Sequence, residues 1–152
     1  FNRAFASFGL SNKVVRLGTL IEENTLAGIG AENSKNLYSS AGYFANIDTP
    51  AAKAFAGKYA ARFGADAPAL NALGQSCYDG MLLLKALAAK AGSFDAAAMD
   101  ASAEGVSYSG PRGAATMAGR HVSKDIFLAE ARGGSFNVVQ TFGNVGVDKP
   151  CG

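Results

Sequence analysis

The segment of residues 14–33 constrains the fold most, because an extended pattern passes directly into a helical one. Residues 14–21, VVRLGTLI, form a short and nearly continuous apolar run, which is typical of a strand covered on both faces. Two glutamates and Asn24 follow at once, and Asn24 suits the N-cap of a short helix over residues 25–33. The sequence therefore predicts a strand whose end meets the start of a helix.

The remaining pattern predicts helices in the middle of the chain and strands at its end. Thr49 and Pro50 suit the N-cap and first position of a helix that Gly64 ends. A longer helix is predicted over residues 71–91, and we expect its apolar face to be buried: Leu73, Cys77, Met81, Leu84, Ala88 and Ala91. Because strands and helices alternate early in the chain, we predict an α/β fold.

Two extended runs near the end of the chain predict a hairpin. Residues 126–131 and 136–142 flank the turn sequence RGGS, and glycines between two such runs are typical of a β-hairpin. Before them, residues 106–116 contain two glycines and a proline and predict a loop or a short extended segment. The α/β fold is therefore expected to carry a late antiparallel β-hairpin.

The composition excludes several classes of protein. Hydrophobic residues make up 49% and charged residues 17% of the chain, which indicates a globular protein and not a disordered one. The net charge is +2 and the cations are scattered singly, whereas a nucleic-acid surface needs clustered cations. No apolar run approaches the roughly 18–20 residues that span a bilayer. We therefore expect no nucleic-acid partner and no membrane span in these residues.

Candidate catalytic groups are few. His121 is the only histidine, and no G-x-S-x-G sequence accompanies it, so we interpret it as structural. The GPRG sequence at 110–113 is interpreted as a turn, because no GK[ST] follows that would make it a phosphate loop. With no nucleophile–base set, no metal-binding cluster and no cofactor motif, the chain is predicted not to be an enzyme, and no metal or cofactor is expected.

The two cysteines, Cys77 and Cys151, fit no metal or redox spacing. Cys77 lies within the helical pattern of residues 71–91 and is expected to be a buried thiol. A disulfide between the two cysteines stays open at this stage, because sequence alone does not decide it.

The acidic corner formed by Glu22, Glu23 and Asn24 has two interpretations. In open α/β sheets, ligands bind outside the carboxyl ends of the strands, and a carboxylate there can accept hydrogen bonds from an ammonium or an amide group. Alternatively, the two carboxylates only complement the positive end of the following helix, which contributes about 0.3–1 kcal/mol. The residues by themselves leave both interpretations open.

A series of motifs resembles a known family. The chain has EEN at 22–24, GIGAE at 28–32, YF at 43–44, IDTP at 47–50 and RFG at 62–64. Further matches are Cys77-Tyr78, Pro111-Arg112-Gly113, His121 and the segment 134–139, GSFNVV. In this order they resemble the solute-binding proteins of ABC transporters with the type I periplasmic fold, in the branch for urea, short-chain amides and branched-chain amino acids.

The resemblance covers nearly the whole chain, but it matches only the later part of the family's sequence. It implies the C-terminal part of a two-lobed fold, with residues 1–42 and 106–152 in the second lobe and 43–105 in the first. We therefore expect these residues to pair with the missing N-terminal part or with a second copy. Alone, they are expected to bind solute weakly or not at all.

The resemblance also implies a function and a site. The protein would capture a small polar solute, such as an amino acid, an amide or urea, in the cleft between the lobes and deliver it to membrane permease subunits. Glu23 would contact the solute with Asn24 beside it, while Leu73 and Tyr78 would lie near the cleft. Urea and amide members carry Asp-Pro where this chain has Asn71-Ala72, which leaves an amino acid or another small polar solute open.

Two locations follow from two versions of this function. A transport protein of this kind would be periplasmic, or extracytoplasmic and membrane-anchored. The alternative is a cytoplasmic ligand-sensing regulator of the same fold, of the amide-responsive negative regulator type.

Overall fold

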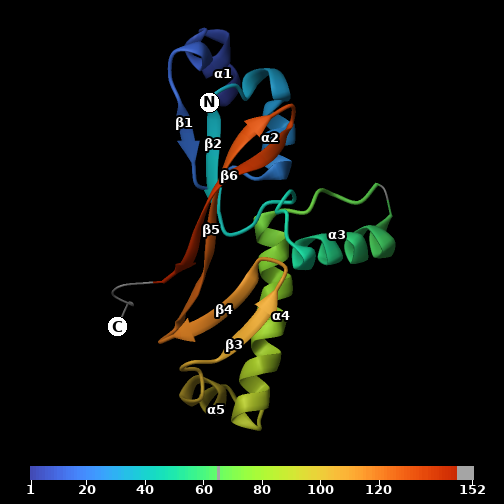
Figure 1. Ribbon diagram of the computed structural model, residues 1–152, viewed down its shortest axis with the longest axis vertical. Helices are drawn as coiled ribbons and strands as arrows, with labels where there is room; N and C mark the ends of the chain where they lie inside the picture. The colour runs from blue at the N-terminus through green and yellow to red at the C-terminus, as the bar shows by residue number, and fades with distance from the viewer. Residues whose placement is uncertain (65, 147–152) are drawn as a thin grey trace.

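The structure, a computed structural model, describes residues 1–64 and 66–146. The molecule is elongated, and the long strand β5 (His121–Arg132) runs between its two regions (Figure 1). One region holds the helices and strands of residues 2–41 and the last strand, residues 135–145, and the other holds those of residues 72–118. The predicted α/β fold is confirmed.

A β-α-β unit opens the sheet. β1 (Arg16–Gly18) pairs in parallel with β2 (Leu37–Ala41), and α2 (Glu23–Ile29) forms the crossover between them. Two neighbouring strands that run in the same direction cannot be joined by a tight hairpin turn, so the chain must cross over between them. η2 (Ala31–Asn33) completes the connection.

Two details of this unit differ from the sequence prediction. β1 has three residues and lies at the edge of the sheet, where Leu17 is 65% exposed, so the strand is not covered on both faces. The N-cap of α2 is Glu22 and not Asn24, which lies in the first turn of the helix. Glu22 has the extended backbone angles of an N-cap residue, and the helix therefore begins at Glu23, earlier than predicted.

Arg16 is the buried residue of β1, and its guanidinium connects three segments. It donates hydrogen bonds to Asn2 Oδ1 (2.8 Å), Ser11 Oγ (3.2 Å) and the carbonyls of Asn33 (3.0 Å) and Lys35 (2.7 Å). A buried guanidinium is tolerated only when its N–H groups find acceptors. These bonds hold α1 (Asn2–Ser7) and η1 (Leu10–Asn12) against the β-α-β unit.

The predicted late hairpin is present and longer than expected. β6 (Ser135–Val145) pairs antiparallel with β5 through a two-residue turn, Gly133-Gly134. Both glycines have positive φ angles (58° and 85°), as a tight hairpin turn of this kind requires. β5 also pairs antiparallel with β2 near its end and with β4 (Gly113–Ala118) near its start, and thereby joins the two regions.

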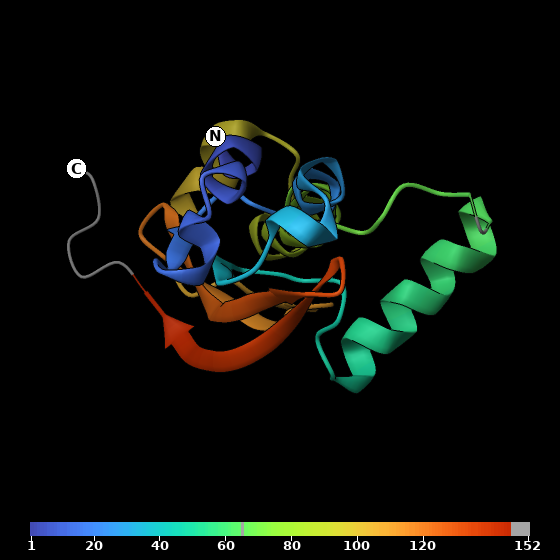
Figure 2. The same ribbon diagram turned by 90° about the horizontal axis from the view of Figure 1, so that it is seen from above.

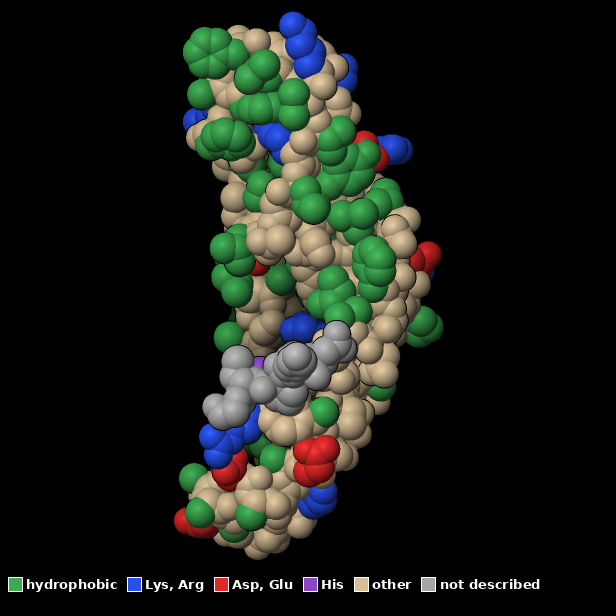
Figure 3. All heavy atoms as spheres, turned by 90° about the vertical axis from the view of Figure 1, so that its left-hand side faces the viewer, with side chains coloured by type: hydrophobic (Ala, Val, Ile, Leu, Met, Phe, Trp, Pro, Cys, Tyr) green, Lys and Arg blue, Asp and Glu red, His purple; other side chains and the backbone are tan. Residues whose placement is uncertain are grey.

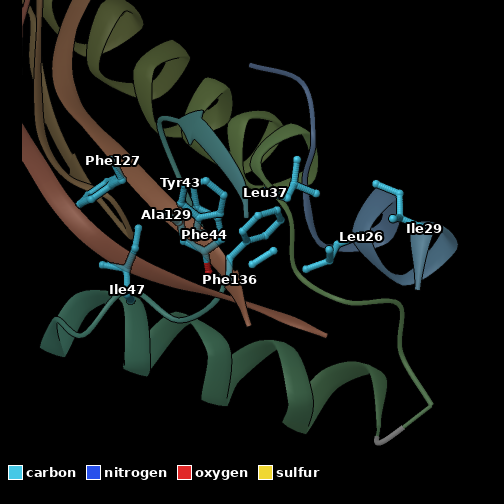
Figure 4. Close-up of a cluster of buried hydrophobic side chains, with 11 residues drawn as sticks. Leu26, Ile29, Leu37, Tyr43, Phe44, Ile47, Phe127, Ala129 and Phe136 are labelled. Carbon is cyan, nitrogen blue, oxygen red and sulfur yellow. The ribbon is translucent and has the colours of Figure 1, made fainter. Parts of the chain in front are cut away.

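The hydrophobic core lies between α2 and the strands β2, β5 and β6. Phe44 and Phe136 pack with their ring centroids 5.0 Å apart, and Leu26 reaches them from α2 (Figure 4). Tyr43 and Phe44 are fully buried although they follow the end of β2. The chain that leaves the sheet therefore carries large core side chains with it.

α3 (Pro50–Phe63) begins and ends as predicted, with Thr49 Oγ1 accepting a hydrogen bond from the Ala52 N–H (3.2 Å) and Gly64 as C-cap. The helix stands apart from the rest of the chain in Figure 2. Ala52 is the buried residue of this helix, whereas Phe63 is exposed.

α4 (Ala72–Ala91) has its predicted limits, but it buries the opposite face. Asn71 Oδ1 caps it by accepting from the Gly74 N–H (2.8 Å). The buried residues are Gln75 and Asp79, which face β3 (Ser107–Gly110), whereas Met81 is 66% exposed. The prediction of a buried apolar face on this helix is therefore wrong for the described residues.

The cysteine prediction is also corrected. Cys77 lies on the outward face of α4 and is exposed, so it is not a buried thiol. Cys151 and the question of a bridge to it lie outside the described residues. A short helix, α5 (Ala96–Ala101), follows α4 and is capped by Asp95 Oδ1, which accepts from the Ala98 N–H (2.9 Å).

Hydrophobic side chains remain on the surface over both regions. Figure 3 shows them across the upper and middle parts of one face. Large exposed side chains include Phe1, Phe8, Leu20, Phe63, Leu73, Met81 and Phe94. Such an extent of exposed apolar surface is typical of a face that contacts other protein.

Candidate functional site

The acidic corner lies where β1 ends and α2 begins. Glu22 is the N-cap of α2, and Glu23 is its first residue, so both carboxylates stand at the positive end of the helix. Asn24 is exposed in the first turn. The two glutamates point to different neighbours, and the corner therefore has an inner and an outer carboxylate.

Glu23 is the inner carboxylate. Its Oε1 accepts a hydrogen bond from the backbone N–H of Ala45 (2.6 Å), and its Oε2 is buried without a hydrogen-bond partner among the described residues. Burial raises the pKa of Glu23 above its ordinary value, and the bond from Ala45 acts in the opposite direction. Glu23, which is predicted to contact the solute, thus also holds the segment that follows β2 through its bond with Ala45.

Glu22 is the outer carboxylate, and it connects the two regions. Its Oε2 accepts a hydrogen bond from the backbone N–H of Leu73 (3.3 Å), in the first turn of α4. The first N–H groups of a helix have no partner within the helix. A side chain from one region therefore satisfies a donor of the other.

A crevice of about 220 Å³ opens at this contact. It is lined by the turn after β1, the end of β2 and the start of α4: Thr19, Leu20, Ile21, Glu22, Ala41, Ala72 and Leu73. Leu73 is 69% exposed and adds an apolar side chain to the lining. This crevice combines one charged acceptor with hydrophobic sides.

Tyr78 lies in a different hollow. It lines an apolar groove of about 360 Å³ between α3 and the start of α4, together with Phe55, Tyr59 and Phe63. The Tyr78 and Phe55 ring centroids are 4.7 Å apart. Of the four predicted site residues, only Leu73 lines the 220 Å³ crevice, whereas Glu23 lies behind its acidic edge.

A second cluster of polar side chains, here called the polar junction, consists of Ser76 and Asp79 of α4, Tyr108 of β3, and Arg112. Arg112 Nε lies 2.7 Å from Asp79 Oδ2, and both side chains are nearly fully buried (3% and 4% exposed). Arg112 Nη2 donates to Ser76 Oγ (2.8 Å), and Tyr108 Oη donates a long hydrogen bond to Asp79 Oδ2 (3.4 Å). These contacts fasten the β3–β4 turn to α4.

Two glycines allow the backbone to approach this junction closely. A Cβ atom at Gly110 would lie 2.4 Å from Asp79 Oδ1, and one at Gly42 would lie 2.8 Å from Arg112 Nη1. Lys124 of β5 is beside Gly42 as well. Burial and the charge of Arg112 lower the pKa of Lys124, while Asp79 opposes this shift.

Sequence reasoning missed the polar junction. GPRG was interpreted only as a turn, which it is, but its arginine is buried. A signal was available in α4, where Gln75 and Asp79 lie four residues apart and therefore share one face. His121, interpreted as structural, begins β5 opposite Ala118.

Neither a metal site nor a membrane span is found in residues 1–64 and 66–146. No group of three or more His, Cys, Asp or Glu side chains there could hold a metal ion. No helix of that part of the chain has the length and apolar character needed to cross a membrane.

Comparison with known proteins identifies the family. Residues 1–135 match the family described as periplasmic binding protein, and the chain belongs to this family. No curated protein matches the chain. The family and the similar solved structures are solute-binding proteins, which are not enzymes.

Three solved structures illustrate the similarity of fold. An amino acid ABC transporter substrate-binding protein from Pseudomonas fluorescens Pf-5 has a TM-score of 0.79 at 21% identity, over 97% of this chain and 41% of its own. A solute-binding protein from R. palustris in complex with benzoate has a TM-score of 0.78 at 20% identity, over 98% of this chain and 41% of its own. A leucine-binding protein from Thermotoga maritima has a TM-score of 0.75 at 20% identity, over 93% of this chain and 40% of its own. The chain thus spans about two fifths of these relatives.

Proposed function

We propose that this chain is part of the substrate-binding component of an ABC transporter, located outside the cytoplasm, that captures a small polar solute and presents it to membrane permease subunits. Family membership supports the solute-binding role. The observation that carries the proposal further is the 220 Å³ crevice, where Glu22 of one region meets the first turn of α4 in the other. A solute held there would contact both regions.

The division into lobes stays a proposal. The sequence prediction places residues 106–152 in one lobe with residues 1–42, whereas in the structure β3 lies against α4 and β4 pairs with β3. We propose that the boundary falls within β5, so that β3 and β4 join the α4 lobe and β6 joins β1 and β2. Closure of two such lobes around a solute is a familiar hinge motion.

The chemistry of the crevice favours a solute with N–H groups. Glu22 offers carboxylate oxygens, Glu23 adds negative charge behind it, and Leu73 supplies an apolar wall. An ammonium or amide group can donate to a carboxylate, whereas the carboxylate of a benzoate would be repelled. The crevice is smaller than the ~300–1,000 Å³ of pockets for drug-sized ligands. We therefore propose an amino acid, an amide or urea as the solute class, with Glu23 and Asn24 beside the acidic edge of the crevice, while Tyr78 belongs to the separate aromatic groove.

The experiment is a titration followed by NMR. The ¹⁵N-labelled chain is titrated with leucine, acetamide, urea and benzoate at millimolar concentrations, where weak binding is detectable. We expect the N–H-bearing solutes to shift the amide signals of Glu22, Glu23 and Leu73, and Glu22→Gln to weaken this response at least about tenfold.

Glu32→Gln is the matched control, because Glu32 is an exposed carboxylate outside the crevice lining. Benzoate shifting these signals while leucine, acetamide and urea do not would overturn the solute class. No response of these amides to any of the four compounds would overturn the crevice as a site that these residues form by themselves.

A further inference from the structure

We propose that Arg112 is a positioning residue that links α4 to the acidic corner through the crossing segment, residues 42–45. This inference rests on the proposed function, because the acidic corner is the proposed solute site. It adds a residue that lies outside the crevice and acts on the corner through the backbone between them.

Arg112 itself has little freedom to move. Its Nη2 is held by Ser76 Oγ at 2.8 Å and its Nε lies 2.7 Å from Asp79 Oδ2, so both anchors belong to α4. The side chain is 3% exposed, and a closely packed interior leaves few other rotamers available to it. The guanidinium therefore moves with α4.

The free side of this guanidinium lies against the start of the crossing segment. A Cβ atom at Gly42 would come within 2.8 Å of Arg112 Nη1 and 3.3 Å of Lys124 Cε. Because these two side chains come from the β3–β4 turn and from β5, Gly42 lies against both. The absence of a side chain at Gly42 permits this approach.

The crossing segment is held in place between Gly42 and its hydrogen bond to Glu23. Tyr43 and Phe44 are fully buried, and the next residue, Ala45, donates its N–H to Glu23 Oε1 at 2.6 Å. A shift of Gly42 relative to α4 is therefore expected to reach the Ala45–Glu23 bond within three residues. The charges of Glu23 and Arg112 both act on the Tyr43 hydroxyl, in opposite directions, which agrees with their closeness to it.

The test follows the Ala45–Glu23 bond without any solute. In Arg112→Lys we expect the Glu23 side-chain carboxyl, followed by ¹³C NMR, to titrate at higher pH than in the unaltered chain. The reason is that the bond from Ala45 lowers the Glu23 pKa, so that weakening this bond raises it further. We also expect the Ala45 amide to exchange with solvent about tenfold faster relative to the amides of β5.

Gly42→Ala should change both readouts in the same direction while leaving the Arg112–Asp79 pair in place, and it serves if Arg112→Lys does not fold. Arg120→Lys is the matched control, since Arg120 pairs with Asp100 on the surface. Loss of overall stability in Arg112→Lys or Gly42→Ala, with the Ala45 exchange ratio and the Glu23 titration unchanged, would overturn the inference. Because no solute is present, this failure is distinct from failure of the solute titration.

Discussion

Around β2 and β5 most of the large buried side chains are aromatic or aliphatic, whereas the buried face of α4 carries the amide of Gln75 and the carboxylate of Asp79, which pairs with Arg112. Phe44 and Phe136 stack in the first region. In the second, Gln75 is 0% exposed, and its amide has no hydrogen-bond partner within the described residues. The large hydrophobic cluster thus lies in the first region, whereas the large apolar side chains Met81 and Leu73 of α4 are exposed in the second.

The two regions are therefore held together by different interactions. Burial of apolar area stabilises the first region directly. A buried ion pair contributes little net stability, since desolvation offsets the attraction, but it fixes the relative placement of its partners. The polar junction therefore orients α4 more than it stabilises it.

The largest effect is expected from the apolar region. Phe44→Ala removes a fully buried ring that packs on Phe136, and we expect a loss of about 3–5 kcal/mol in the free energy of unfolding. Phe94→Ala is the control, because Phe94 is exposed and should change stability little. Urea denaturation measures both, and equal losses would contradict the contrast between core and surface.

The next effect breaks the polar junction. Asp79→Asn leaves the buried Arg112 charge without its partner, and we expect a loss of about 3 kcal/mol. Replacing both residues, as in Asp79→Leu with Arg112→Met, should recover most of that loss, since no uncompensated charge remains. Denaturation of the single and double variants forms the measurement, and a double variant no more stable than Asp79→Asn would contradict an orienting role for the pair.

A pH series measures how Glu23, in the acidic corner, contributes to the free energy of unfolding. The folded-state pKa of Glu23 is raised, so the folded chain binds more protons than the unfolded chain between the ordinary value of 4.5 and the raised one. The free energy of unfolding should therefore fall as pH rises through this interval. Glu23→Gln should remove this component of the slope, while the control Glu32→Gln should retain it, as measured by denaturation from pH 4 to pH 8. An unchanged slope in Glu23→Gln would show that another group is responsible.

The smallest effect compares one glycine from each region. Gly28 in α2 and Gly80 in α4 have no atoms near the place of a Cβ, and alanine at either should stabilise by about 0.5–1 kcal/mol. Gly110→Ala should instead destabilise, because its Cβ would lie 2.4 Å from Asp79 Oδ1. Melting temperatures check all three variants, and a stabilised Gly110→Ala would contradict the close packing at the polar junction.

Local signals predicted much of the fold. Thr49 caps the helix that it was expected to cap, and the glycines after Arg132 form the hairpin turn. These features depend on a few neighbouring residues and are therefore readable from sequence. The β3–β4 hairpin was less clear, because its glycines and proline favour a turn without fixing the strands.

The burial pattern of α4 was not predictable in the same way. Helical periodicity identifies an apolar face, but it does not say whether the described residues cover that face. Glu22 was recognised as part of the acidic corner, but its bond to Leu73 joins residues far apart in sequence. Arg112 was missed because its burial depends on α4, β3 and β5 together, which no local pattern encodes.

We propose that the solute lies in the crevice between Glu22 and Leu73. The most direct measurement is the set of intermolecular NOEs between bound leucine and methyl-labelled leucines of the chain. We predict NOEs to the Leu73 methyl groups and none to those of Leu84, which lies on the same helix outside the crevice. NOEs to Leu84, or to Leu70 in the aromatic groove, with none to Leu73, would contradict this placement.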